Sequence, residues 1–375
     1  MKNRSIIAIF IIVFVGISLI ITIPILTLSI GISPYHVIDE TDDSFIYAPS
    51  TSSPIENLNV EAEYANIEIK YVSPLVDYYA MIEVNIEMSG KNLAGKNYKD
   101  FFDANLDFTN SSPSFIMAFK ANIDKLEVLP LIKNLTIIVN LRSGIIFDLN
   151  ITLEKGNVGL FVPFRMPINN VIVNVSNGNI FYDFNYCIIE GNITGIVNEG
   201  NIFYDFNHCK IDGNIIGIAN AGDIVLKSTN VKYIRNSSWT FEIENGDFEI
   251  YIYQYEDLGA NITSMAKISD GGVFILYEDN SANIGARFEI PYGYPFLNMS
   301  RLPDCLYRDE LSCAHQWMDG FHHNDLTSQE KGRAILTSLD LLEKSVKNYY
   351  NMTIEMSFSH IDLLGFFDID LVSIN

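Results

Sequence analysis

The sequence predicts an all-β fold, a parallel β-solenoid or β-helix ectodomain, with an N-terminal transmembrane helix and a short C-terminal helical segment. The main observation is a tandem duplication, because residues 178–199 and residues 200–221 match at 16 of 22 positions without a gap. A short fixed period is typical of solenoids, in which each repeat is one coil that buries its apolar face against its neighbours. A second observation, a long apolar run near the N-terminus, predicts the membrane segment.

Residues 5–32 are predicted to be a transmembrane anchor, with residues 1–4 as a cytoplasmic tail. These twenty-eight residues are uncharged and almost entirely apolar, and a helix needs only roughly 20 to cross a bilayer. Lys2 and Arg4 precede the run and acidic residues such as Asp39 follow it. The positive-inside rule therefore predicts a single-pass plasma-membrane protein with an extracellular ectodomain. A cleaved signal peptide is the alternative, although its apolar core usually spans only about 7–15 residues.

The composition favours an exported surface protein. Residues 33–56 contain three prolines and a Ser/Thr run, which predicts a stalk or linker. The net charge of −22 at pH 7 argues against nucleic acid as a partner, because binding to phosphates requires a basic surface. We expect the lipid bilayer as a partner through residues 5–32, and surface glycans or other surface proteins as further partners.

Asn-x-Ser/Thr triplets are frequent, as expected for an extracellular glycoprotein. An Asn-rich chain also forms such triplets by chance, so we do not expect all of them to carry a glycan. The candidate acceptors are Asn110, Asn134, Asn150, Asn174, Asn192, Asn236, Asn261, Asn298 and Asn351.

The ectodomain is expected to begin with a β-rich part, residues 57–155, followed by the solenoid repeats in residues 156–300. Apolar and polar side chains alternate at residues 66–71, which is the period of a strand. A short amphipathic stretch at residues 98–106 predicts a helix within this first part.

Within the repeats, Gly-Asn-Ile recurs at alternating spacings of 13 and 9 residues. After one such Gly-Asn pair, Ile180, Tyr182 and Phe184 alternate with Phe181 and Asp183, which is strand periodicity. Gly next to Asn or Asp predicts turns that need positive φ. We therefore expect two strands and two turns per coil, with strands stacked about 4.8 Å apart and Asn side chains bonded to one another along the stack.

Candidate ligand contacts lie on one face of the repeated strands. Asp183 and Asp205 occupy equivalent positions in consecutive coils, and Lys227 holds that position in the next. Phe181 and Phe203 share this face and are candidates for a flat aromatic platform that binds a sugar. Facing carboxylates would suit acid–base chemistry on a glycosidic bond. The simpler interpretation is a duplicated Asp whose repulsion Lys227 offsets, and passive contact with a glycan or Ca²⁺ is a third.

Cys187 and Cys209 are also equivalent positions of consecutive coils. In a parallel ladder their α-carbons would lie about 5 Å apart, within the range of a disulfide. A ladder of small buried residues is the other interpretation, and both remain open. Tyr186 and His208, which precede the two cysteines, are expected to be structural.

Residues 301–330 are predicted to be a Cys/His-rich loop. Outside the cell, a disulfide between its two cysteines is the default. A metal site is the alternative, because Zn²⁺ is commonly held by four Cys and His ligands, but an oxidised pair cannot bind a metal. We otherwise expect no cofactor, with Ca²⁺ or Zn²⁺ as the ions left open. The candidate ligands are Cys305, Cys313, His315, His322 and His323.

Residues 331–375 are expected to form a C-terminal helix followed by strands. Apolar residues recur at helical spacing in residues 327–347, with Thr327 as a candidate N-cap. The chain then returns to strand-like apolar runs at residues 352–374.

Two short units, Asn-Gly-Asn-Ile at residues 177–180 and Asn-Gly-Asp-Phe at residues 245–248, resemble the strand openings of the prokaryotic "putative adhesin" family of β-solenoid domains (DUF4097-like). The resemblance covers residues 57–290 and is best between residues 156 and 273. It implies a cell-surface or envelope role without established chemistry. The Cys/His loop and the C-terminal segment depart from the family pattern.

The sequence therefore predicts a membrane-anchored cell-surface β-solenoid with a structural or adhesive role. No nucleophile elbow, zinc-protease motif or phosphate-binding loop occurs in the sequence, so we expect no enzymatic activity. The alternative is a carbohydrate-active β-helix enzyme, a lyase or a glycosidase, that uses Asp183 and Asp205.

Overall fold

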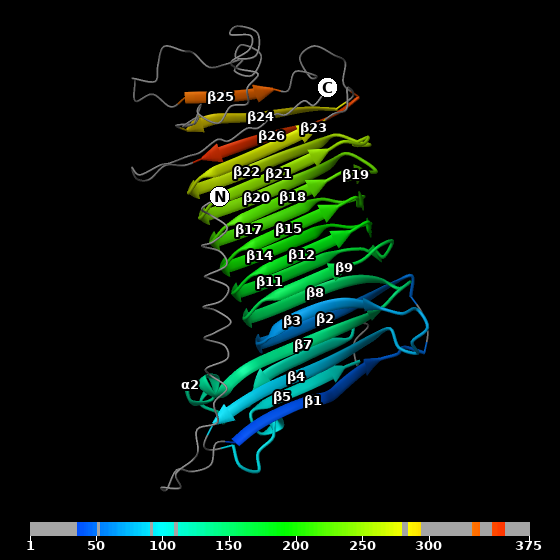
Figure 1. Ribbon diagram of the computed structural model, residues 1–375, viewed down its shortest axis with the longest axis vertical. Helices are drawn as coiled ribbons and strands as arrows, with labels where there is room; N and C mark the ends of the chain where they lie inside the picture. Colours follow the sequence, from blue (N-terminus) through cyan, green and yellow to red (C-terminus); the bar gives the residue numbers. More distant parts are fainter. Residues whose placement is uncertain are drawn as a thin grey trace, which may run out of the picture.

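The chain folds into a stack of β-coils that is long in the stacking direction (Figure 1). The computed structural model describes residues 36–50, 53–90, 93–108, 112–279, 284–293, 332–337 and 347–356. Within these ranges the strands form three sheets, of ten, twelve and four strands, and the helical elements are three single turns. The prediction of an all-β fold with parallel sheets is confirmed.

The elements of each sheet follow in spatial order. The ten-stranded sheet contains β1 (His36–Tyr47), β4 (Ala80–Gly90), β7 (Ile132–Arg142), β3 (Asn66–Val72), β9 (Val158–Val162), β12 (Ile180–Asn185), β15 (Ile202–Asn207), β18 (Ile224–Thr229), β21 (Phe248–Gln254) and β23 (Val273–Asp279). The twelve-stranded sheet contains β25 (Gly332–Thr337), β24 (Ile284–Gly293), β26 (Asn348–Met356), β22 (Ile262–Asp270), β20 (Ser237–Asn245), β17 (Ile215–Ala221), β14 (Ile193–Glu199), β11 (Val171–Asn177), β8 (Ile146–Lys155), β2 (Ile55–Tyr64), β6 (Ser114–Phe119) and β5 (Phe102–Asp107). The four-stranded sheet contains β10 (Pro167–Ile168), β13 (Ile188–Ile189), β16 (Lys210–Ile211) and β19 (Lys232–Tyr233). The helical turns are η1 (Tyr98–Asp100), α2 (Lys125–Val128) and η2 (Leu129–Leu131).

One coil passes once through each of the three sheets. β11, β12 and β13 make up one coil, and β14, β15 and β16 make up the next. Equivalent strands pair in parallel, for example Val171 with Ile193 and Ile180 with Ile202. The structure has three strands per coil rather than the predicted two. The third strand was missed because β13 has only two residues, too few to produce an alternating pattern.

The corner between the twelve-stranded and ten-stranded sheets explains the recurring Gly-Asn pairs. Gly178 has a φ of 145°, which glycine adopts readily, and a Cβ added there would lie 1.7 Å from the carbonyl oxygen of Gly156. The following Asn179 accepts the backbone N–H of Asn201 through its Oδ1 at 2.9 Å. In the same way, Oδ1 of Asn157 accepts the backbone N–H of Asn179 at 3.0 Å. The predicted Asn ladder is confirmed. The predicted positive φ is present at Gly178, Gly200 and Gly222, whereas Gly191 and Gly213, in the other set of Gly-Asn pairs, do not have it.

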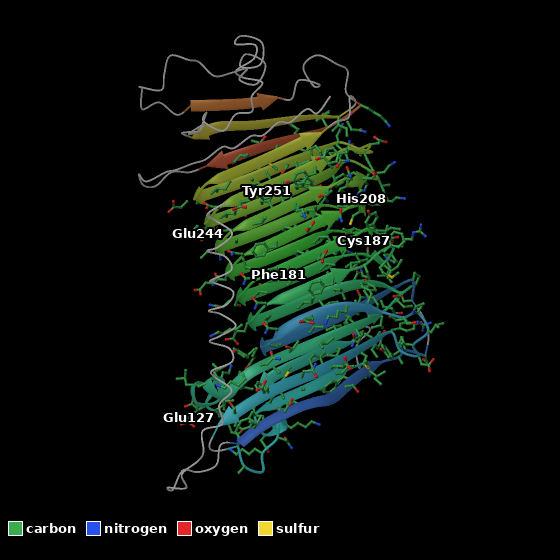
Figure 2. The ribbon with its side chains drawn as sticks, viewed as in Figure 1. Glu127, Phe181, Cys187, His208, Glu244 and Tyr251 are labelled. Atoms are coloured by element: carbon green, nitrogen blue, oxygen red, sulfur yellow. The ribbon has the colours of Figure 1, made fainter. Side chains whose placement is uncertain are left out.

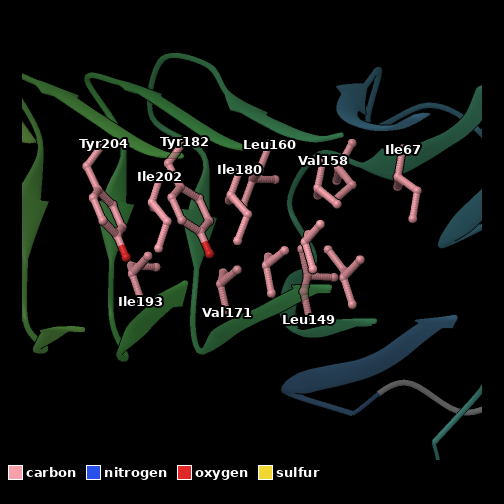
Figure 3. Packing of buried hydrophobic residues seen from close by; sticks show 14 of the residues in the cluster. Ile67, Leu149, Val158, Leu160, Val171, Ile180, Tyr182, Ile193, Ile202 and Tyr204 are labelled. Atoms are coloured by element: carbon pink, nitrogen blue, oxygen red, sulfur yellow. The ribbon is translucent and has the colours of Figure 1, made fainter. Parts of the chain in front are cut away.

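The core lies between the sheets and is built from ladders of like side chains (Figure 3). Tyr182 and Tyr204 stack with ring centroids 4.9 Å apart. The Tyr204 hydroxyl donates to the carbonyl of Ile216 at 2.5 Å, and a Cβ added to Gly195 would lie 2.9 Å from that hydroxyl oxygen. Glycine in the twelve-stranded sheet therefore makes room for tyrosine from the ten-stranded sheet.

The predicted stalk, residues 33–56, contains ordered sheet structure. Residues 36–47 form β1, which pairs antiparallel with β4, and β2 begins at Ile55. Ile38 and Tyr47 are buried. The register of β1 shifts between Glu40 and Asp43, so a bulge interrupts the alternation by which a strand is recognised in the sequence.

Two segments predicted to be helical contain strands instead. In residues 98–106 the helix is limited to the single turn η1, and β5 follows it, antiparallel to β6. In residues 327–347 the described parts are Lys347 and β25, and β25 pairs antiparallel with β24. In both places the apolar residues are spaced in a way that fits either a helix or a strand. Pairing with a neighbouring strand then decides the conformation.

The predicted membrane anchor, residues 5–32, and the predicted Cys/His-rich loop, residues 301–330, lie outside the described residues. Among the helices of the part that the structure describes, none is long and apolar enough to span a membrane.

Candidate functional site: the outward face of the ten-stranded sheet

The outward face of the ten-stranded sheet carries phenylalanines that are partly exposed. Phe181 in β12 and Phe203 in β15 are direct register partners. Their ring centroids are 4.9 Å apart and their planes differ by 2°. The Phe181 side chain is 39 % exposed, and Figure 2 labels it on this sheet. The predicted stacking of these two rings on one face is present.

A third phenylalanine, Phe161, lies on this face beside a glycine. Gly159 in β9 is the register partner of Phe181, and a Cβ added to Gly159 would lie 2.8 Å from a ring carbon of Phe161. The Phe161 ring therefore leans over Gly159, and it is 41 % exposed. We call Phe161, Phe181 and Phe203 the aromatic strip. The sequence analysis did not identify Phe161, because the only indication of its position was the lack of a side chain at Gly159.

The aromatic strip differs from the flat sugar platform that we expected. The parallel rings of Phe181 and Phe203 turn their faces toward each other, and Val225 is the register partner on the other side of Phe203. Stacking of this kind uses ring faces within the ladder and leaves the electropositive ring edges toward solvent. The strip is therefore a narrow apolar ridge of ring edges.

A polar column runs beside the aromatic strip and is held together by its own hydrogen bonds. The Asn207 side chain donates to Oδ1 of Asn185 at 2.7 Å, and Asn185 donates to Oδ1 of Asp183 at 3.0 Å. Toward the next coil, the ammonium of Lys227 in β18 lies 3.0 Å from Oδ2 of Asp205 in β15. Both predicted carboxylates therefore have a protein partner, and Lys227 has the predicted position beside Asp205.

The arrangement favours a contact surface over acid–base catalysis. Asp183 and Asp205 are register partners on adjacent strands, as predicted. However, a cation already neutralises Asp205, and an amide already donates to Asp183. With the Lys227 and Asp205 side chains 48 % and 43 % exposed, water screens this ion pair.

A second aromatic group occupies the corner between the ten-stranded and four-stranded sheets. Tyr186 and His208 stack with centroids 4.6 Å apart and planes 5° apart. Phe164 lies 5.7 Å from Tyr186, and the Arg165 guanidinium lies 4.6 Å from the Phe164 ring. Tyr186 and His208 have φ of 52° and 51°; positive φ is uncommon for residues other than glycine, although His, Asn and Asp adopt it more often than the rest. The stacked rings connect two consecutive coils at this corner.

The other predicted sites in the solenoid and the Cys/His-rich loop are a cysteine pair and a metal site. Cys187 and Cys209 are both buried free thiols, with Sγ atoms 3.1 Å apart. Across the described ranges, no group of three or more His, Cys, Asp or Glu side chains could hold a metal ion, and the predicted ligands Cys305, Cys313, His315, His322 and His323 lie outside those ranges.

The candidate glycan acceptors are distributed over several faces. Asn110 and Asn298 lie outside the described residues, and glycosylation of the others stays a prediction. Asn261 and Asn351 are partly exposed. The exposed acceptors are Asn134, Asn150, Asn174, Asn192 and Asn236.

Comparisons with known proteins identify no relative by sequence. No protein-family model and no curated protein matches the chain. A crystal structure of a "putative cell adhesion protein" from Clostridium sporogenes is 10 % identical and covers 89 % of this chain and 100 % of its own, with a TM-score of 0.22. A "putative adhesin" from Bacteroides fragilis is 10 % identical and covers 65 % of this chain and 89 % of its own, with a TM-score of 0.31. At these TM-scores the two likenesses do not establish a shared fold.

Proposed function

We propose that the chain is a membrane-anchored, cell-surface β-solenoid with a structural or adhesive role. Its contact surface is the outward face of the ten-stranded sheet. The observation that carries the proposal is the aromatic strip, Phe161, Phe181 and Phe203. The side chains of Phe161 and Phe181 are 41 % and 39 % exposed there. A group of exposed large apolar side chains on one surface indicates an interaction site.

The polar column supports the same role. Asp183, Asn185 and Asn207 present carboxylate and amide groups at strand spacing beside the ridge of ring edges. Such groups can exchange hydrogen bonds with the hydroxyls of a polymer that lies along the coils. Many weak, regularly spaced contacts suit adhesion, because avidity multiplies affinities that are low one at a time.

The charge of the chain favours neutral partners. A net charge of −22 repels acidic polymers over about one Debye length, roughly 8 Å at physiological ionic strength. We therefore propose uncharged surface glycans as the partner class.

The alternative is a carbohydrate-active enzyme, and one observation favours it. Asp183 and Asp205 are neighbours in register, and glycosidases use a pair of carboxylates on either side of the bond that breaks. The partners already bound to each carboxylate make this the second choice.

The test compares two double variants of the full chain reconstituted in vesicles. Phe181→Thr/Phe203→Thr removes the stacked pair of rings from the aromatic strip but keeps residues that favour strands. Ile196→Thr/Ile218→Thr is the matched control, since these residues are register partners in two consecutive coils on the twelve-stranded sheet. We measure retention of the vesicles on chitin beads and on cellulose beads.

We expect the unchanged chain and the isoleucine control to be retained, and the phenylalanine variant to be washed off at least about tenfold faster, which is roughly 1.4 kcal/mol. Equal retention of all three would contradict the proposed contact surface. If the unchanged chain binds neither polymer, adhesion to neutral glycans of this kind is wrong. Circular dichroism checks that both variants fold.

A further inference from the structure

Cys187 and Cys209 lie in register at the corner that leads from the ten-stranded to the four-stranded sheet. Cys187 precedes β13 and Cys209 precedes β16, and the N–H of Lys210 donates to the Cys187 carbonyl at 2.9 Å. Both side chains are 1 % exposed. Parallel neighbours are about 4.8 Å apart, and the α-carbons of a disulfide are 4.4–6.8 Å apart. The backbone spacing is therefore suitable for a covalent bond between the two coils.

The sulfur atoms are already in close contact. The Sγ–Sγ distance is 3.1 Å, about 1 Å longer than a disulfide bond of roughly 2.0 Å. Small side-chain rotations would close this gap without moving the ladder of backbone hydrogen bonds.

A metal bridge fits this geometry less well. Two thiolates at about 2.3 Å from a tetrahedral Zn²⁺ lie roughly 3.8 Å apart, and the ion needs two further ligands. No additional His, Cys, Asp or Glu completes such a group within the described part of the chain. A neighbour of the pair is the backbone carbonyl of Phe184, whose oxygen lies 3.1 Å from the Cys209 sulfur.

We propose that Cys187 and Cys209 form a disulfide that joins two consecutive coils of the stack. The oxidant is an external disulfide. The thiolate of one cysteine attacks it and releases one thiol; the thiolate of the other cysteine then attacks the mixed disulfide and releases the second thiol. Two cysteine thiols and one external disulfide thus become one intrachain disulfide and two external thiols.

The burial of the pair determines when this exchange takes place. The hydrogen bond to Cys209 and then burial raise the pKa of the Cys187 thiol, whereas the hydrogen bond to Cys187 lowers the pKa of the Cys209 thiol although burial opposes this. Burial of the two sulfur atoms, rather than a shortage of thiolate, therefore limits the exchange. With 1 % exposure, an external disulfide cannot reach either sulfur. We therefore place the exchange during folding, before the coils close, and expect the finished bond to resist reductants. This inference is independent of the proposed adhesive role.

The experiment uses the full chain in detergent with Cys305→Ser and Cys313→Ser, so that the pair at the corner provides the two remaining thiols. The chain is unfolded and reduced, then refolded with reduced and oxidised glutathione, and free thiols are alkylated in denaturant. Peptides are mapped by mass spectrometry without reduction. The expected result is a cross-linked peptide pair containing residues 187 and 209, with no alkylated thiol. The same chain oxidised only after refolding should keep both thiols for hours.

Two controls separate the outcomes. Cys209→Ser in the same background should retain one thiol or one glutathione adduct and give no cross-linked peptide. The unchanged full chain, purified without refolding and mapped in the same way, should contain the same cross-link rather than pairs with residues 305 or 313. Two free thiols, or two separate glutathione adducts, in a refolded chain with native circular dichroism would overturn the proposal. Absence of the 187–209 cross-link from the natively purified chain would also overturn it.

Discussion

The Lys227 ammonium lies 3.0 Å from the Asp205 carboxylate, and it occupies the register position that Asp183 and Asp205 hold in the two preceding coils. A duplicated acidic residue would place like charges side by side at strand spacing, which is destabilising. The basic residue in the third coil offsets part of that repulsion.

Replacement of Lys227 by methionine should lower the free energy of unfolding by about 0.5 kcal/mol at low salt, because an exposed ion pair contributes little. The difference should shrink in 1 M salt, where the Debye length is about 3 Å. Urea titrations at both salt concentrations measure it. Lys210→Met is the matched control, since its register neighbour is Lys232 and its removal relieves repulsion. A larger loss for Lys210→Met than for Lys227→Met would contradict this account.

Asp183→Asn tests the enzyme alternative. We expect neither the unchanged chain nor the variant to release reducing ends from β-linked polysaccharides above the background. The variant should also be slightly more stable than the unchanged chain, by up to about 0.5 kcal/mol, because a like charge opposite Asp205 is removed. Turnover by the unchanged chain that disappears in Asp183→Asn, with an equal unfolding midpoint, would establish the enzyme instead.

Gly178→Ala should destabilise the stack by about 4 kcal/mol or more. The added Cβ would lie 1.7 Å from the carbonyl oxygen of Gly156, so adjacent coils would have to separate. Gly144→Ala is the control, since Gly144 has a φ of 88° but no atom within 4 Å of an added Cβ. That substitution should cost only the left-handed conformation, about 1–2 kcal/mol. If thermal unfolding gave a similar loss of stability for the two variants, contact between coils would not be the reason that glycine is required at residue 178.

Asp257 should contribute a small stability that depends on pH. The backbone N–H of Gly259 donates to its carboxylate, and Lys347 and Lys232 lie 3.6 and 3.9 Å away; together they lower the pKa of Asp257 below 3.8. A lowered pKa in the folded state stabilises the chain above pH 4, and this contribution is lost as the pH falls through the folded-state pKa. Asp257→Asn should therefore be less stable at pH 7, by no more than about 1 kcal/mol because the group is exposed to water.

Urea titrations of Asp257→Asn and the unchanged chain at pH 7 and at pH 2.5 check this sign. The two stabilities should converge at the lower pH. A difference that persists or grows there would show that the carboxylate acts through its shape rather than its charge.

The ladders and the Gly-Asn corner of the repeats were predictable from the sequence, whereas the third strand of each coil and the ends of the stack were not. The duplicated Gly-Asn pairs specify their own turns, because Gly178 supplies the positive φ and Asn179 supplies the side-chain acceptor for the next coil. By contrast, β1 and β25 pair antiparallel with strands distant in the sequence. Their local pattern was ambiguous, and no repeated neighbour resolved it.

The candidate site was predicted as a set of residues but not as a geometry. Equivalent positions in a repeat must form ladders, so the positions of Phe181, Phe203, Asp183 and Asp205 followed from the 22-residue period. The side-chain packing did not follow. The Phe161 ring leans over Gly159, a relationship within β9 that has no counterpart in the next coils.

Local periodicity was enough to predict the all-β class, the length of the coil and the residues that share each ladder, because the chain repeats the same pattern. The three sides of each coil, the face-to-face arrangement of the Phe181 and Phe203 rings and the 3.1 Å distance between the sulfur atoms of Cys187 and Cys209 came from the three-dimensional structure. These features depend on how the side chains of stacked coils pack against one another. The spacing of residues along the chain does not specify the distances between those side chains.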